Sequence, residues 1–356
     1  ALLKWSARLA AAVVFAWLVL MVGGAVQAAL RLPDLQPWHR FRPPSELRAA
    51  DMGPAFTLAD YLEREARVFD EVARAIEAPL AGRRPPGVHR YVPESVAHPS
   101  RLGQPWNRTT ELVPPAGVRG GALLVHGLTD SPYSLRAIAE LLRDEGYYVL
   151  VMRMPGHGTV PAGLSNVEWE DWMAATRLAV REARRWIDPS APLHLVGFSN
   201  GGALAVKYAL DALENPQLAR PDRLILASPM IGITRFARLA GVAGWPAVLP
   251  AFAKTAWLSI VPEFNPFKYN SFPVNGGRQS FRLTQVLQDQ IGRMANTNQL
   301  NGLAPILTFQ SVLDFTVSTR AIISALYAYL PANGSELVLF DVNRSVKFGP
   351  LLRRSS

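Results

Sequence analysis

The sequence of 356 residues contains no cysteine. A disulfide framework, a cysteine metal site and a thiol nucleophile are therefore excluded. Dense blocks of Lys and Arg are also missing, because the net charge of +9 is spread along the chain and comes mainly from Arg. No His-Glu-x-x-His motif or phosphate-binding glycine loop is present either. We therefore predict no nucleic-acid partner, no metal and no cofactor.

One long apolar run opens the chain. Residues 9–30 carry no charge and follow Lys4 and Arg8. A membrane-spanning helix needs about 20 apolar residues, whereas the core of a secretory signal has about 7–15. We expect an uncleaved transmembrane helix within residues 1–30. The basic flank places the rest of the chain on the non-cytoplasmic side, periplasmic or extracellular. The alternative is a secreted protein, with signal cleavage near residues 25–29.

Residues 31–110 read as a connecting region. Residues 31–55 are rich in Pro, Arg and Gln and are typical of a stalk. Residues 57–78 place apolar side chains at helical spacing among charged ones, with Thr57 as the N-cap. We predict a stalk followed by one amphipathic helix.

Residues 111–356 alternate short apolar runs with helical stretches, which predicts an α/β class domain with a doubly wound, mostly parallel sheet. The predicted helices include residues 135–145 and 169–186. The predicted strands are residues 122–125, 147–152, 193–196, 224–227, 306–309 and 337–340. Residues 229–303 interrupt this alternation with aromatic residues and Pro, and we predict a helical cap insertion that lines a pocket for an apolar ligand.

The sequence Gly-Phe-Ser-Asn-Gly at 197–201 follows a predicted strand and opens a helix rich in small residues. This context is typical of a nucleophile elbow, where a serine sits on a strained strand-to-helix turn. Small residues are needed beside it because the helix backbone passes close to the strand. Ser199 is therefore the candidate nucleophile.

A second turn offers an oxyanion hole. A predicted strand ends in His126-Gly127, and the glycine allows the next backbone N–H to face the site. Backbone N–H groups of Leu128 and of Asn200, the residue after the nucleophile, would hold a developing negative charge.

These segments resemble the α/β-hydrolase superfamily, most closely its carboxylesterase and monoglyceride lipase branch, which is serine aminopeptidase-like. The resemblance covers roughly residues 115–345. The matching segments are residues 124–129, 154–158, 197–202 and 313–317. The resemblance implies an α/β-hydrolase fold and makes Asp314 the catalytic acid, with Val317 following it. Asp341, which ends the last predicted strand, is a weaker candidate.

The catalytic base is missing from its expected position. The resemblance places a histidine after the last strand, but all six histidines precede Ser199. We expect the base beyond Ser356 in a longer parent chain; the alternatives are a non-catalytic member of the fold or a histidine recruited from elsewhere. By the resemblance, His126 and His157 belong to structural turns.

Together these observations predict a serine hydrolase that cleaves small apolar or lipid-like carboxylic esters through an acyl-enzyme. The alternatives are a non-catalytic pseudoenzyme on the same fold and an aminopeptidase or amidase.

Overall fold

The computed structural model describes residues 2–83, 88–232, 250–314 and 316–341. Its main feature is a seven-stranded sheet with strand order β1-β3-β2-β4-β5-β8-β9. Neighbouring strands are parallel except β1 and β3, which are antiparallel. The strands of this sheet are β1 (Thr110–Leu112), β2 (Gly120–Val125), β3 (Tyr147–Met152), β4 (Leu193–Phe198), β5 (Arg223–Ala227), β8 (Ile306–Ser311) and β9 (Glu336–Phe340).

The predicted α/β fold and its parallel strands are confirmed. Strands β2 and β3 are almost wholly buried, as expected for a sheet that is covered on both faces. The short antiparallel β1 was not predicted, because three residues with an exposed Glu111 carry no period that identifies a strand.

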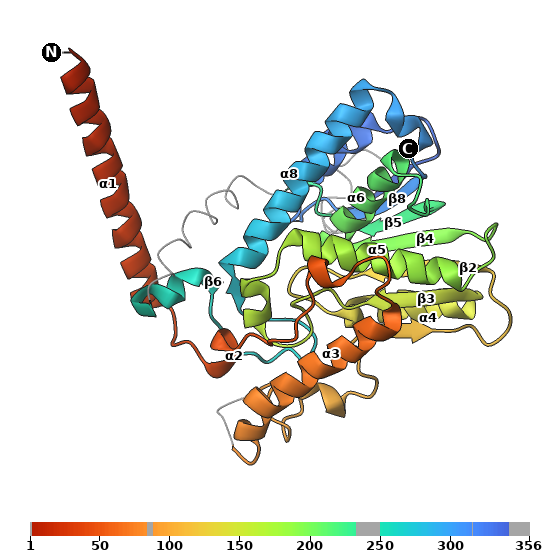
Figure 1. The fold of residues 1–356 in the computed structure, drawn as a ribbon, viewed down its shortest axis with the longest axis horizontal. Coiled ribbons are helices and arrows are strands. Elements are labelled where there is room, and N and C mark those ends of the chain that lie inside the picture. Colours follow the sequence, from red (N-terminus) through yellow and green to blue (C-terminus); the bar gives the residue numbers. More distant parts are fainter. Residues whose placement is uncertain (1, 84–87, 233–249, 315, 342–356) are drawn as a thin grey trace, which may run out of the picture.

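Helices cover both faces of the sheet (Figure 1). The predicted helix at 169–186 forms as α5, and the one at 135–145 forms as a 3₁₀ turn followed by α4. The α-helices of the described residues are α1 (Leu2–Arg31), α2 (Pro37–Arg40), α3 (Leu58–Val72), α4 (Arg136–Asp144), α5 (Trp169–Arg185), α6 (Asn200–Glu214), α8 (Val274–Asn296) and α9 (Thr319–Ala325).

Helix α3 corresponds to the predicted amphipathic helix, and Thr57 caps it through a reciprocal pair of hydrogen bonds with Asp60. The α-helix ends at Val72, and the chain continues as a π turn over Ala73–Glu77 and a 3₁₀ turn over Ala78–Leu80.

The segment before α3 packs against the domain. Leu47 is fully buried in the main core, and Trp38 lies in a smaller apolar cluster with Tyr91. A buried ion-pair group adds to this packing: the Arg153 guanidinium, just after β3, lies 2.9 Å from Glu46 and 2.8 Å from Glu65 of α3. Residues predicted as a stalk thus share a core with the sheet, while the domain boundaries stay a prediction.

The predicted transmembrane helix requires a correction. A bilayer span needs a helix that is both long and apolar enough to cover the hydrocarbon core without unsatisfied polar groups. Within the described part of the chain, no helix meets that requirement. The helix α1 does form, and Figure 1 shows it extending away from the sheet, but the assignment of residues 1–30 as a transmembrane segment is overturned.

The predicted cap falls partly outside the described residues, since 233–249 are not described. Its remaining part comprises the 3₁₀ helix η8 (Pro250–Ala256), the small antiparallel pair β6 (Trp257–Ser259) and β7 (Phe272–Pro273), and the long helix α8. These elements supply one wall of the site described below.

The strand order decides where a site can form. The chain passes from β2 outward to β3 and then returns to β4 on the other side of β2. The loops that leave β2 and β4 therefore diverge and open a crevice at the carboxyl edge of the sheet. Val125 and Gly197 pair across these two strands, so the loops begin at the same level.

Candidate active site

Ser199 lies at the sharp turn between β4 and α6. Its backbone has φ 53° and ψ −115°, a region that non-glycine residues rarely occupy. The turn is held by its neighbours, because Ser199 N donates to Ala227 O at 2.9 Å and Met230 N donates to Ser199 O at 2.9 Å. Strain of this kind persists where surrounding structure fixes it, as at a nucleophile elbow.

Two glycines allow the turn to pack. A Cβ atom on Gly201 would overlap the carbonyl oxygen of Val125 at the end of β2. A Cβ on Gly202 would lie 2.7 Å from Pro229 Cβ. Only glycine fits either position. This confirms the predicted close approach between the helix and the strand.

Leu128 lies in the loop after β2 and lines the same pocket as Ser199. Gly127 packs closely against the elbow, since a Cβ there would lie 3.2 Å from Ser199 Cβ. The next residue, Thr129, has φ 63°, so the loop turns sharply after Leu128. The predicted oxyanion donor is thus brought beside the predicted nucleophile.

Asn200 is the first residue of α6 and is 1% exposed. The N-terminal N–H groups of a helix point outward without intrahelical partners and carry partial positive charge. The Asn200 side chain is engaged elsewhere, because its Oδ1 accepts a 2.8 Å hydrogen bond from Ser280 Oγ on α8. The backbone N–H of Asn200, rather than its side chain, is therefore the predicted donor of the oxyanion hole.

Asp314 follows β8 and lines the same pocket. Its Oδ1 accepts hydrogen bonds from Thr316 N at 2.8 Å and Val317 N at 2.9 Å. Gln310 Nε2 lies 3.4 Å from Oδ2. Val317, which the sequence singled out, is thus one of the groups that fix the carboxylate in place.

The pocket that holds Leu128, Ser199 and Asp314 has a volume of about 650 Å³. The insertion after β5 supplies much of its wall, through Leu258, Lys268 and Phe272 among others. The wall is mixed in character, with apolar side chains beside Lys268 and Asn270, rather than uniformly apolar. The structure thus gathers three of the four predicted site residues around one cavity and buries the fourth, Asn200, beside it; their catalytic roles stay predictions.

His126 is not among the residues that line this pocket. Its Nδ1 donates to Gly127 O at 2.9 Å, and its Nε2 accepts from Met154 N at 3.1 Å. Burial lowers the pKa of His126 to about 4, so the ring is neutral at neutral pH. Both ring nitrogens are engaged, and the residue joins the loops after β2 and β3.

His157 lies against His126, with ring centroids 4.9 Å apart. Its Nδ1 donates to Pro155 O at 3.0 Å. Burial, together with the adjacent His126, holds the pKa of His157 well below its usual range. Neither histidine lines the Ser199 pocket, so neither is placed to accept the Ser199 proton.

Among the residues that the structure describes, no group of three or more His, Asp or Glu side chains is placed to hold a metal ion.

A match to the family described as serine aminopeptidase, S33, spans residues 117–342 and so covers most of the chain. The chain belongs to this hydrolase family. The family match begins after α3 and leaves out residues 1–116.

Two curated relatives match shorter stretches. A thermostable monoacylglycerol lipase from Bacillus sp. (strain H-257) is 36% identical over 90 residues, which is 25% of this chain and 34% of the relative. The phospholipase YtpA of Bacillus subtilis (strain 168) is 25% identical over 115 residues, or 31% of this chain and 40% of the relative. The chain thus spans between about a third and two fifths of the length of these relatives.

A solved structure reported for LipS and LipT, two metagenome-derived lipolytic enzymes, shares the fold. It has a TM-score of 0.53 at 23% identity and covers 69% of this chain and 96% of its own.

Sequence reasoning missed the pocket residues that the insertion contributes. Tyr269 is the main example: its backbone N donates to Thr129 O at 2.7 Å, and its hydroxyl accepts from Thr159 N at 2.8 Å and donates to Gly156 O at 3.0 Å. It connects the insertion to the loops after β2 and β3, at the carboxyl edge of the sheet. The aromatic richness of the insertion was visible in the sequence, but no spacing identified which ring would bridge those loops.

Proposed function

We propose that this chain is a serine hydrolase that cleaves carboxylic esters of lipid-like molecules through an acyl-enzyme. The observation that carries the proposal is the strained elbow at Ser199, which lines one pocket with Leu128 and Asp314 in a member of the S33 family. The names of the curated relatives, a monoacylglycerol lipase and a phospholipase, support lipid esters as the substrate class.

In the proposed first step Ser199 Oγ attacks the ester carbonyl carbon while its proton passes to a base. The carbonyl oxygen becomes negatively charged, and the N–H groups of Leu128 and Asn200 donate to it. The C–O bond of the ester then breaks, and the alcohol leaves with that proton. Water attacks the acyl-enzyme in the same way and releases the carboxylic acid.

Asp314 would orient the base by accepting its N–H, as the acid of a triad does. No histidine follows Ser199 in the 356 residues. No group among the described residues is assigned as the base, and its identity stays a prediction.

The pocket volume and lining support an ester with a compact apolar acyl portion. Leu258, Phe272 and Met230 offer apolar surface near Ser199. A cavity of about 650 Å³ lies within the usual range for small-molecule sites.

Fluorophosphonate labelling of the full-length protein tests the nucleophile. We expect labelling of the wild type, loss of labelling in Ser199→Ala, and full labelling in Ser190→Ala. Ser190 is a matched control because it lies in the exposed turn before β4, the strand that ends at the elbow. An unlabelled wild type with an intact circular dichroism spectrum would contradict the proposal.

Substrate comparison separates the proposal from its alternatives. Turnover of p-nitrophenyl acyl esters well above that of aminoacyl p-nitroanilides is expected; the reverse preference would favour an aminopeptidase. The absence of a histidine in the described Ser199 pocket favours a second candidate, a non-catalytic binding protein. That candidate predicts a folded full-length protein without turnover of either substrate.

A further inference from the structure

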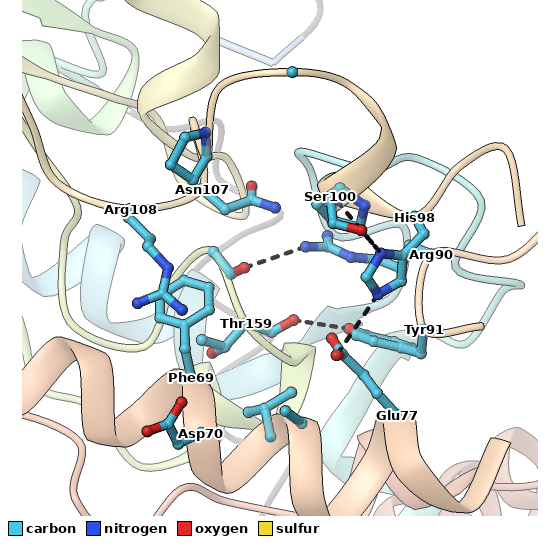
Figure 2. Close-up of a pocket in the computed structure, with 16 residues that line it drawn as sticks. Phe69, Asp70, Glu77, Arg90, Tyr91, His98, Ser100, Asn107, Arg108 and Thr159 are labelled. Atoms are coloured by element: carbon cyan, nitrogen blue, oxygen red, sulfur yellow. Dashed lines mark hydrogen bonds and ion pairs between the residues drawn. The ribbon is translucent and has the colours of Figure 1, made fainter. Parts of the chain in front are cut away.

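A second cavity is lined mostly by residues outside the family match. It has a volume of about 370 Å³ and is lined mainly by α3, the turn after it and residues 90–108. Only Gly158 and Thr159 of its lining fall within residues 117–342. Figure 2 shows this cavity with the side chains that surround it.

Arg90 reaches into the cavity with unused hydrogen-bond donors. The residue is 1% exposed, and its Nη2 donates to Gly158 O at 3.2 Å. Its Nε and Nη1 have no hydrogen-bond partner among the described residues. Buried polar groups are nearly always hydrogen-bonded, and a buried charge is costly unless it is paired. The unpaired Nε and Nη1 of Arg90 therefore need a partner that the described residues do not supply.

The described residues around Arg90 do not supply that partner. The rings of Tyr91 and Tyr269 lie 5.4 Å and 5.5 Å from its Cζ and offer only their faces. The buried carboxylate of Glu263 accepts from Asn270 N at 3.0 Å and Ser271 N at 2.8 Å. Glu263 interacts electrostatically with Arg90 but makes no hydrogen bond to its Nε or Nη1.

A second guanidinium lines the cavity. Arg108 stacks on the ring of Phe69, with its Cζ 4.0 Å from the ring centroid. The lining also holds two carboxylates: Glu77 lies 3.6 Å from His98 Nε2, and Asp70 is exposed on α3. Both interact electrostatically with Arg108, so the buried guanidinium of Arg90 is the cation of the cavity with unused donors.

Asn107 places an unpaired hydrogen-bond acceptor in the cavity, in contrast to the unpaired donors of Arg90. Its Nδ2 donates to Pro266 O at 3.0 Å, while its buried Oδ1 has no partner among the described residues. A carbonyl oxygen accepts hydrogen bonds and repels an oxyanion. A ligand that satisfies the whole cavity therefore carries a donor as well as a negative charge.

We propose that this cavity binds a small hydroxylated oxyanion, with its carboxylate or phosphate group on the Arg90 guanidinium. Arg presents its N–H groups as a planar fork that matches carboxylate and phosphate oxygens. A hydroxyl of the same molecule would donate to Asn107 Oδ1. The volume of about 370 Å³ exceeds that of a single water by roughly tenfold, which favours an organic molecule over a bare ion.

Isothermal titration calorimetry of the full-length protein in a chloride buffer tests this proposal. The probes are glycerol 3-phosphate, lactate, inorganic phosphate and glycerol. We expect saturable binding of glycerol 3-phosphate or lactate, at least tenfold weaker binding of inorganic phosphate, and no binding of neutral glycerol. Whichever of the first two binds more tightly identifies the oxyanion as phosphate or carboxylate.

Variants locate the binding. Arg90→Gln and Arg108→Gln are each expected to weaken it at least tenfold, while Arg101→Gln leaves it unchanged. Arg101 is the matched control, because it is an exposed arginine of the same segment whose Nε donates to Pro93 O. Arg108 is only half buried, so its variant keeps the test decisive where Arg90→Gln fails to fold.

No saturable binding of either organic anion would overturn the proposal, as would equal affinity in wild type and Arg108→Gln. The same titration on Ser199→Ala is expected to give the wild-type affinity. This result would separate the anion site from the proposed hydrolase function, because it does not depend on turnover.

Discussion

At the residue scale, the elbow requires a residue without a Cβ atom at position 201. Gly201 faces the end of β2 so closely that a single methyl group would overlap Val125 O. The strained backbone of Ser199 is possible only while the start of α6 remains seated against that strand.

We therefore predict that Gly201→Ala destabilises the fold by about 1–3 kcal/mol through overpacking. It should also reduce fluorophosphonate labelling, because the elbow must shift. Urea unfolding measures the first effect and labelling at a fixed time measures the second.

Gly292→Ala is the matched control, since a Cβ there meets nothing within 4 Å in the helix α8. Gly292→Ala should stabilise the folded protein by about 0.5–1 kcal/mol, because alanine loses less backbone entropy than glycine on folding. Equal effects of the two substitutions would contradict the packing argument.

At the scale of elements, α3 and the segment before it are joined to the sheet by Arg153. The guanidinium and the carboxylates of Glu46 and Glu65 are nearly inaccessible to solvent. Burial raises the pKa of Glu65, while Arg153 and the hydrogen bonds from Thr109 act against that rise. Two buried carboxylates thus rely on one cation.

Arg153→Met should cost about 3–5 kcal/mol, because it leaves buried carboxylates without their partner. The amides of α3 should lose hydrogen-exchange protection more than those of β4. Arg67→Met serves as the control, since the Arg67–Glu63 pair is exposed and worth at most about 1 kcal/mol. A loss in Arg153→Met no larger than in this control would refute the role of the ion-pair group.

At the scale of the whole molecule, buried neutral histidines make folding stability depend on pH. The pKa of His126 is about 4 in the folded state, against 6.5 for an unperturbed histidine. Between these values the unfolded chain binds a proton that the folded chain does not. The contribution of His126 is therefore complete above pH 6.5 and is lost as the pH falls toward 4.

His126→Gln should flatten this dependence. The difference in unfolding free energy between wild type and variant is expected to change by about 1.4 kcal/mol per pH unit in that range, up to about 3 kcal/mol in all. The pKa of His157 is lowered mainly by burial and secondarily by His126, so removing His126 weakens the second cause and acts in the same direction. Urea unfolding at pH 4.5, 5.5 and 7 measures the effect, and parallel curves for the two proteins would rule it out.

The raised pKa values of Glu65 and Glu263 have the opposite influence on stability, because the folded chain then binds more protons than the unfolded chain. They are common to both proteins and cancel in the difference.

Local patterns in the sequence were enough to predict the parallel strands and the α/β fold. Short apolar runs separated by amphipathic helices leave few other ways to bury a sheet on both faces. The turn at Ser199 was also predictable from local sequence. Small residues directly after a strand indicate that the following helix packs closely against it.

Other features needed the tertiary structure because their residues are distant in sequence. Tyr269 meets Thr159, Asn200 meets Ser280, and Arg153 meets Glu46, and no local period connects these partners. The expectation of a transmembrane helix rested on a count of apolar residues, and the finding on the described helices overturned it.

The sequence by itself determined the fold class, the six parallel strands and the candidate residues Ser199, Leu128, Asn200 and Asp314, because each depends on a short-range pattern or on a short motif shared with a family. Only the tertiary structure decided which of them share a pocket, that His126 is occupied on both ring nitrogens, and that Arg90 is buried with donors unused. These depend on packing between distant segments, which the order of strands sets and local sequence does not encode.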